Sequence, residues 1–218
     1  GSIPPYVNSA IGQPTGPLYI TAIIFKIFDP SIFTLRLSMS IFGILTVGVL
    51  YIFLRYHFST VVSFLTTLSF CFALMHIHFS HIAFMLISAP FFALLSLIIF
   101  IIGRKQKKLL YIIISAFIMG IGMYSYNTFI IFPIPLFILL CADLLYYRKA
   151  YQLKALLVYI CVFVVSAAPL LYIMLSDPDF YFSHHRAYSI LSTPDFLNGR
   201  LWNKSILVLL NGIQNLKS

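Results

Sequence analysis

The chain has 218 residues, of which 61% are hydrophobic and only 9% charged. A soluble domain carries about a quarter charged residues, so this composition excludes a soluble protein and predicts an all-α, polytopic membrane protein. The net charge of +9 does not indicate a nucleic-acid partner, because the cations stand in short clusters between apolar runs.

The first segment, residues 1–33, is expected to be an outer loop with one short helix. Residues 17–28 are apolar but too short to cross a membrane, and they contain Lys26, so an interfacial or re-entrant helix fits them best. The chain opens with Gly1 rather than Met and closes, over 201–218, with what looks like the start of a further membrane element. We therefore expect a fragment of a longer protein.

Residues 34–175 are expected to form a bundle of about six transmembrane helices. A helix needs about 20 apolar residues to cross the hydrocarbon core. The apolar runs nearest to this length are 35–54, 60–79, 82–102, 109–126, 128–142 and 155–175. The fifth is short and contains Pro133 and Pro135, which predicts a helix that is kinked or tilted, or that shares its crossing with a neighbour.

The interiors of these spans carry no Asp, Glu, Lys or Arg, which weighs against an ion-coupled transporter. Gly120 and Gly122 lie within a span, so we expect them to be packing glycines rather than a nucleotide-binding loop. Cys71, Cys141 and Cys161 are scattered through apolar runs. They are expected to be small buried hydrophobic residues, not a disulfide framework or a zinc site.

The connecting loops differ in charge between the two sides of the membrane. If the spans alternate, one side receives Arg55, residues 103–108 and residues 143–154, with eight Lys or Arg residues and one acid. The other side receives residues 1–33, a long loop at 176–200 and two short turns, with four of the five acids. By the positive-inside rule the first side is cytoplasmic. We therefore expect the function on the extracytoplasmic face, where the longer polar loops gather.

Three histidines, His76, His78 and His81, stand together at the outer end of the second expected span. Residues i and i+2 of a helix point about 200° apart, so His76 and His78 cannot share a face, whereas His78 and His81 can. Two interpretations stay open. One is a metal site completed by another loop; the other, which we favour, is an interfacial turn whose imidazoles bind backbone groups and lipid headgroups.

The outer loop at 176–200 holds the densest polar stretch of the chain. Arg186 is the only cation of residues 176–191, and it is flanked by His184, His185 and Tyr188. A guanidinium binds phosphate oxygens in bidentate fashion, so this arginine suits a phosphate or diphosphate group. The alternative is an interfacial anchor paired with an aspartate of the same loop.

Four stretches, in this order, resemble a known family. They are "GQPTGPLYITAIIFKIFDPSIFTLRL", "HIHFSHIAFMLISAP", "GIGMYSYN" and "DPDFYFSHHRAYSI". The family is that of the protein O-mannosyltransferases and aminoarabinose transferases, within the GT-C superfamily. Its members share a Pro-Leu-Tyr helix, an Arg-Leu that opens the next span, a Phe-Ser-Arg turn, and a Gly-x-Gly-x-Tyr-x-Tyr stretch.

The resemblance implies transfer of a sugar from a polyprenyl-phosphate donor to a lipid, glycan or protein acceptor, at the extracytoplasmic face of a prokaryotic cell membrane. It implies that Arg186, His81 and Ser80 lie near the donor phosphate. The residues expected to line the outer substrate cleft are Tyr6, Asn8, Gln13, Tyr126, Asn127, His184, His185 and Tyr188. The acidic base of such enzymes follows their first span and is expected upstream of Gly1.

Three positions depart from the family pattern. His81 stands where Arg is usual, which keeps a hydrogen-bond donor but makes its charge depend on pH. Ala89 precedes Pro90 where several branches carry Asp, and only Gln13 and Gly16 stand near the place of a Lys found in some branches. No metal ligands are assigned, and a divalent metal cofactor is left open. The alternative function is a non-enzymatic membrane protein, either a transporter subunit or an inactive transferase-like scaffold.

Overall fold

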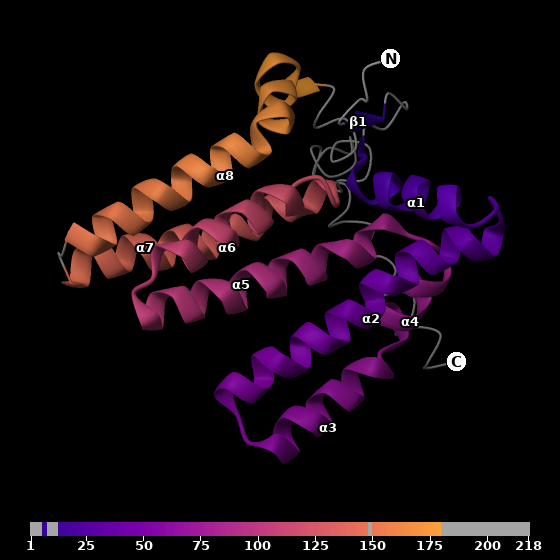
Figure 1. Cartoon of the computed structure of the whole chain (residues 1–218), viewed down its shortest axis with the longest axis horizontal. Coiled ribbons are helices and arrows are strands. Elements are labelled where there is room, and N and C mark those ends of the chain that lie inside the picture. Colours follow the sequence, from indigo (N-terminus) through magenta and orange to yellow (C-terminus); the bar gives the residue numbers. More distant parts are fainter. Residues whose placement is uncertain (1–5, 8–12, 148–149, 180–218) are drawn as a thin grey trace, which may run out of the picture.

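The computed structural model describes residues 6–7, 13–147 and 150–179 (Figure 1). This part of the chain is helical apart from two short strands, which confirms the all-α prediction. Its helices are α1 (Gly16–Ile27), α2 (Ile32–His57), α3 (Thr60–Cys71), α4 (Leu74–His81), α5 (Ser88–Gln106), α6 (Leu109–Gly122), α7 (Pro133–Tyr147) and α8 (Ala150–Ser176). Two 3₁₀ turns, η1 (Met85–Ile87) and η2 (Asn127–Ile131), precede α5 and α7, and the strands β1 (Tyr6–Val7) and β2 (Gln13–Pro14) precede α1.

The long helices run back and forth beside one another (Figure 1). The most extensive helix contacts are between α5 and α6, between α6 and α8, and between α2 and α5. One end of the bundle, which we call the α1 end, carries α1, α4 and the turn after α6 (Figure 1). The opposite end, which we call the basic end, brings together residues from the last turn of α2, the α5–α6 connection and the facing ends of α7 and α8.

Four helical segments of the described chain are long and apolar enough to cross a membrane: Ile32–His57, Met85–Gln106, Asn127–Tyr147 and Ala150–Ser176. The pair α3 and α4 would make a fifth span, but it is bent by 53° at its break. By length and apolarity alone, the described chain therefore supplies four or five of the about six expected spans, and α6 is one of the shorter apolar helices. The apolar run 109–126 contains a helix of only 14 residues, because the backbone tightens into three-residue turns after Gly122.

The prolines begin α7 rather than kink its middle. Pro133 and Pro135 stand in the first turn of α7, where a missing backbone N–H leaves no hydrogen bond unmade, and η2 extends the span before them. Pro169, in contrast, lies inside α8, and Figure 1 shows α8 changing direction toward its C-terminal end. α1 has 12 residues, which agrees with the expected short helix.

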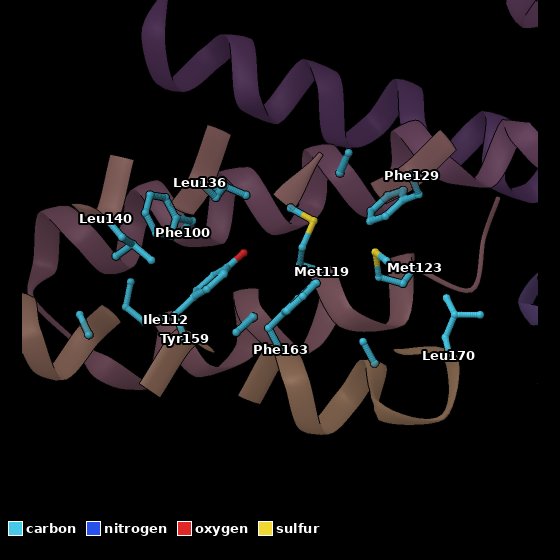
Figure 2. Packing of buried hydrophobic residues seen from close by; sticks show 14 of the residues in the cluster. Phe100, Ile112, Met119, Met123, Phe129, Leu136, Leu140, Tyr159, Phe163 and Leu170 are labelled. Carbon is cyan, nitrogen blue, oxygen red and sulfur yellow. The ribbon is translucent and has the colours of Figure 1, made fainter. Parts of the chain in front are cut away.

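The main core lies between α5, α6, α7 and α8. Figure 2 shows its large side chains, among them Phe100, Tyr159, Met119 and Phe129, in a row along the length of the helices. The Tyr159 ring meets the Phe100 ring edge-on, with 6.0 Å between centroids. A second, smaller cluster of Met39, Phe42 and Ile87 joins α2 to the start of α5.

Many large apolar side chains remain on the outside of the bundle, as is expected where lipid replaces water. Cys141 and Cys161 are among the exposed residues, so the prediction that they are buried is wrong. The prediction assumed that apolar side chains must be buried inside the protein. This is true in water, but in a membrane an apolar helix surface can face hydrocarbon without a free-energy cost. All three cysteines are free thiols, and Cys71 is half-buried.

Small and hydroxyl side chains let the helices approach closely. A Cβ added at Gly120 of α6 would lie 2.8 Å from the Cβ of Ser166 in α8, and closer still to its Oγ. A Cβ at Gly122 would collide with the Phe129 ring, so the prediction that both are packing glycines is confirmed. Between α5 and α6, Ser96 and Ser115 each donate a hydrogen bond to the other's carbonyl oxygen at 2.9 Å.

We expect Gly120→Ala to force α6 and α8 apart and to lower the free energy of unfolding by about 1–3 kcal/mol. Chemical unfolding in detergent, followed by circular dichroism, measures this. Gly48→Ala is the matched control, because nothing lies within 4 Å of the Cβ it adds. Ser166→Gly should recover part of the loss in Gly120→Ala. An equal loss for the two glycine substitutions would contradict the close contact.

Candidate functional site

α1 is fixed across the α1 end of the bundle by its first residue. The Gly16 N–H donates a hydrogen bond to the Tyr124 carbonyl oxygen at 3.0 Å, and a Cβ on Gly16 would lie only 2.6 Å from that oxygen. Pro17 follows, and its fixed φ favours the start of a helix. The Pro-Leu-Tyr segment therefore sits directly against the turn that follows α6.

A hydroxyl pair holds α1 to α2. The oxygens of Thr21 and Ser38 are 2.8 Å apart, and both residues are buried. Each hydroxyl also lies within hydrogen-bond distance of a carbonyl oxygen of its own helix, Thr21 of Pro17 at 3.2 Å and Ser38 of Leu35 at 2.7 Å, so either hydroxyl can be the donor of the pair. Such polar contacts between helices are a main source of association in a membrane.

An apolar pocket of about 430 Å³ lies beside α1, and we call it the α1 pocket. Its lining residues come from α1, α2, α5 and the end of α6; they are Gly16, Pro17, Tyr19, Ile20, Phe42, Phe92, Ile121, Tyr124 and Ser125. Apolar atoms make up nearly all of its wall. A pocket of this size and composition suits a hydrocarbon chain rather than a charged or sugar-like group.

Ser80 and His81 line a separate, smaller pocket of about 240 Å³ between α2 and α4. α4 is tied to α2 there, because Ser40 Oγ donates to the Ser80 carbonyl oxygen at 3.1 Å, and Gly43 leaves room for Ser80 Oγ. His81 is exposed at the last position of α4, where its imidazole is available to a ligand. His76 also lines this pocket.

Tyr126 and Asn127, expected to line an open cleft, are both buried at the start of η2. The Tyr126 ring packs against Phe84 with centroids 5.5 Å apart, and Phe84 packs against Phe79 at 5.3 Å. This row of rings joins the turn after α6 to the end of α4. The structure thus brings Ser80, His81 and Tyr126 to the same end of the bundle, where Tyr126 packs against Phe84.

The remaining predicted site residues are only partly placed. β1 pairs antiparallel with β2, so the backbone of Tyr6 lies opposite Pro14 and that of Val7 opposite Gln13, just before α1. This brings the backbones at positions 6 and 13 to the α1 end. Asn8, His184, His185, Arg186 and Tyr188 lie outside the described residues.

Phe42, Phe92 and Tyr124, which help to form the α1 pocket, were not singled out in the sequence. Apolar residues inside a membrane span give no local signal that separates a pocket wall from a core or a lipid-facing position. The one usable signal was the Gly-x-Gly-x-Tyr-x-Tyr stretch, which contains Tyr124 at the centre of the turn.

No group of three or more His, Cys, Asp or Glu side chains is placed to hold a metal ion within the described ranges. α4 is helical through all three of its histidines, so His76 and His78 project from different sides. The histidine cluster alone is therefore not a metal centre of the usual three- or four-ligand kind.

A family model described as dolichyl-phosphate-mannose-protein mannosyltransferase matches residues 12–173, about three quarters of the chain. The chain belongs to this family. Comparison with curated proteins and with solved structures gave no significant match. The matched part of this mannosyltransferase-family protein includes α1, the α1 pocket, and Ser80 and His81 of α4. The match and the apolar helices identify the protein as an integral membrane protein of the glycosyltransferase type.

We expect the Thr21–Ser38 hydrogen bond to couple α1 to α2 with about 0.6–1.7 kcal/mol. A double-mutant cycle of Thr21→Val and Ser38→Ala, measured by unfolding in detergent, gives this coupling energy. Thr46→Val replaces Thr21→Val in the control cycle, because among the described residues the Thr46 hydroxyl bonds only to the Phe42 carbonyl of its own helix. Additive effects in the first cycle would show that α1 is held by other contacts.

Proposed function

We propose that this protein transfers a sugar from a polyprenyl-phosphate donor to a lipid, glycan or protein acceptor at the extracytoplasmic membrane face. The observation that carries the proposal is the α1 pocket, an apolar cavity at the same end of the bundle as Ser80 and His81 of α4. A polyprenyl phosphate has the matching chemistry, with a long hydrocarbon chain that ends in a charged group.

The distribution of charge supports the choice of face. Five cations stand at or next to the basic end, where one helix ends and the next begins. They are Arg55, Arg104, Lys105, Lys107 and Lys108. By the positive-inside rule this end is cytoplasmic, which places the α1 end outside. The α1 pocket then opens near the outer boundary of the hydrocarbon core, where the phosphate of a lipid donor resides.

In the proposed reaction, the α1 pocket binds the hydrocarbon part of the donor, and polar residues at the α1 end bind its phosphate. The isoprenoid chain occupies the α1 pocket, and the phosphate lies toward the end of α4 and the outer loop that contains Arg186. His81 and Arg186 donate hydrogen bonds to the phosphate oxygens, on which negative charge grows as the bond to the sugar breaks. Ser80 does so by turning its hydroxyl away from the His76 carbonyl oxygen, to which it donates at 2.8 Å in this structure. The acceptor hydroxyl gives its proton to a general base as it attacks the sugar.

Filling the α1 pocket should impair use of a lipid donor. We expect Ile20→Trp to raise the KM for a polyprenyl-phosphate sugar about tenfold or more, because an indole occupies space that the chain needs. Transfer of radiolabelled sugar by membranes that contain the complete protein measures this. Ile23→Trp is the control, since Ile23 lies on the same helix but is 58% exposed and outside the pocket.

An unchanged KM in Ile20→Trp, with normal folding, would argue against the pocket as the donor site. If the unaltered complete protein transferred no sugar from any lipid-linked donor, the transferase proposal itself would fail. A non-enzymatic scaffold with the same fold would then be the better description.

The role of His81 is tested by removing its side chain. We expect His81→Ala to lower kcat about tenfold to a hundredfold, through loss of one donor to the leaving phosphate. His81→Arg should retain transfer, because a guanidinium supplies the same hydrogen bonds. His78→Ala serves as control, since this neighbouring histidine is exposed and does not line the pocket with Ser80. Equal activity of the two alanine variants would contradict the assignment.

A further inference from the structure

A cavity of about 600 Å³ lies at the basic end, far along the helices from the α1 pocket and larger than it. Five helices contribute to it: its lining includes His57 of α2, Arg104 and Lys105 of α5, Asp143 of α7 and Gln152 of α8, and α6 adds aliphatic surface. We call it the basic pocket. The proposed transfer reaction makes no use of it.

One arginine in the basic pocket is held in a fixed orientation. Arg104 forms a bidentate ion pair with Asp143, through Nε to Oδ2 and through Nη2 to Oδ1 at 2.5 Å. Two of the five guanidinium N–H groups are used in this way, which leaves three for another acceptor. The Arg104 side chain is 46% exposed and that of Asp143 only 11%, so the carboxylate is covered while the outer edge of the guanidinium is open.

Positive charge exceeds negative charge around this cavity. Asp143 neutralises Arg104, but Lys105 and Lys107 also line the pocket, and none of its other described lining residues is acidic. The Lys105 ammonium lies 4.2 Å from the centre of the Tyr56 ring, which positions it without removing its charge. The described walls therefore carry two cations in excess. With this end cytoplasmic, as proposed above, these cations face the leaflet that holds the anionic lipids.

The backbone at Lys107 adds a separate indication. Lys107 ends α5 in the left-handed region, at φ 52°, a conformation that glycine adopts without strain and lysine does not. A lysine is nevertheless present, and its side chain lines the pocket. An observed strained residue at a cavity points to a use for its side chain.

The deeper wall of the pocket has a different character. It is aliphatic, and its residues are Ile101, Ile112, Leu139 and Leu140. Gln152 adds a buried side-chain oxygen that has no hydrogen-bond partner among the described residues. A ligand that fits all of this has an anionic phosphate, a hydroxyl that can donate to Gln152, and an apolar portion.

We propose that the basic pocket binds the headgroup of an anionic glycerophospholipid of the cytoplasmic leaflet, with phosphatidylglycerol as the chemistry that fits best. Its phosphate diester contacts Arg104, Lys105 and Lys107, a glycerol hydroxyl donates to Gln152, and the start of an acyl chain lies on the aliphatic wall. The lipid thereby joins α2 to α5, α7 and α8 at the end of the bundle opposite the proposed transfer site.

The test is a titration of the purified complete protein in detergent with short-chain phosphatidylglycerol, followed by calorimetry. Parallel titrations use phosphatidylcholine of the same chain length and inorganic phosphate. We expect saturable binding of phosphatidylglycerol that is at least about tenfold tighter than that of either comparison ligand. Lys105→Gln with Lys107→Gln should weaken this binding about tenfold or more.

The matched control is Lys108→Gln with Lys154→Gln, which removes the same charge from residues that are exposed and outside the pocket. Equal weakening in the two double variants would overturn the proposal in favour of a diffuse surface charge. Equal affinity for phosphatidylcholine would also overturn it, and tight binding of inorganic phosphate would make the ligand a free anion.

A second variant separates binding from folding. Lys107→Gly removes a charge but also relieves the strained backbone, so it should raise the unfolding midpoint while it weakens phosphatidylglycerol binding. If Lys107 served only to end α5, its substitution would leave the affinity for phosphatidylglycerol unchanged. Unchanged lipid affinity in Lys107→Gly would therefore count against the proposal.

Discussion

Close approach between helices is the condition on which this bundle depends. Lipid is as apolar as the side chains, so burial of Leu, Ile and Phe gives little reason for the helices to associate. Two close contacts hold these helices together instead. Gly120 of α6 lies against Ser166 of α8, and Ser96 of α5 and Ser115 of α6 exchange hydrogen bonds. These contacts bring the backbones near enough for the large core side chains, such as Tyr159, to interlock around them.

Much of the fold could be predicted because hydropathy reports directly on the bilayer. The apolar runs, the short first helix and the packing role of Gly120 all follow from chain length and residue size. Two expectations failed for physical reasons. α6 is shorter than its apolar run because backbone hydrogen bonds form a turn after Gly122. The apolar run continues through this turn, so hydropathy gives no sign of where the helix ends. The exposure of Cys141 and Cys161 depends on which helix face meets lipid, and the composition of the helix does not record that.

The site was less predictable than the fold, since polar residues are visible in an apolar sequence and pocket walls are not. Ser80 and His81 stand out as polar residues, and the structure places them in a small pocket at the α1 end. Tyr126 stands out for the same reason but is buried against Phe84. The α1 pocket arises from the crossing of α1 over α2, α5 and α6, and it depends on distances between segments about 100 residues apart.

α2 has a central place among the contacts of the first half of the chain. It packs against α1, α3, α4 and α5, whereas α3 has its main contact with α2. A ribosome delivers these helices in order, so α1 to α4 enter the bilayer before α5 has been made. Until then the face of α2 that carries Met39 and Phe42 has no partner from the later helices. Assembly of this protein therefore includes an interval in which lipids or an insertion factor must cover that face, and the arrival of α5 ends it.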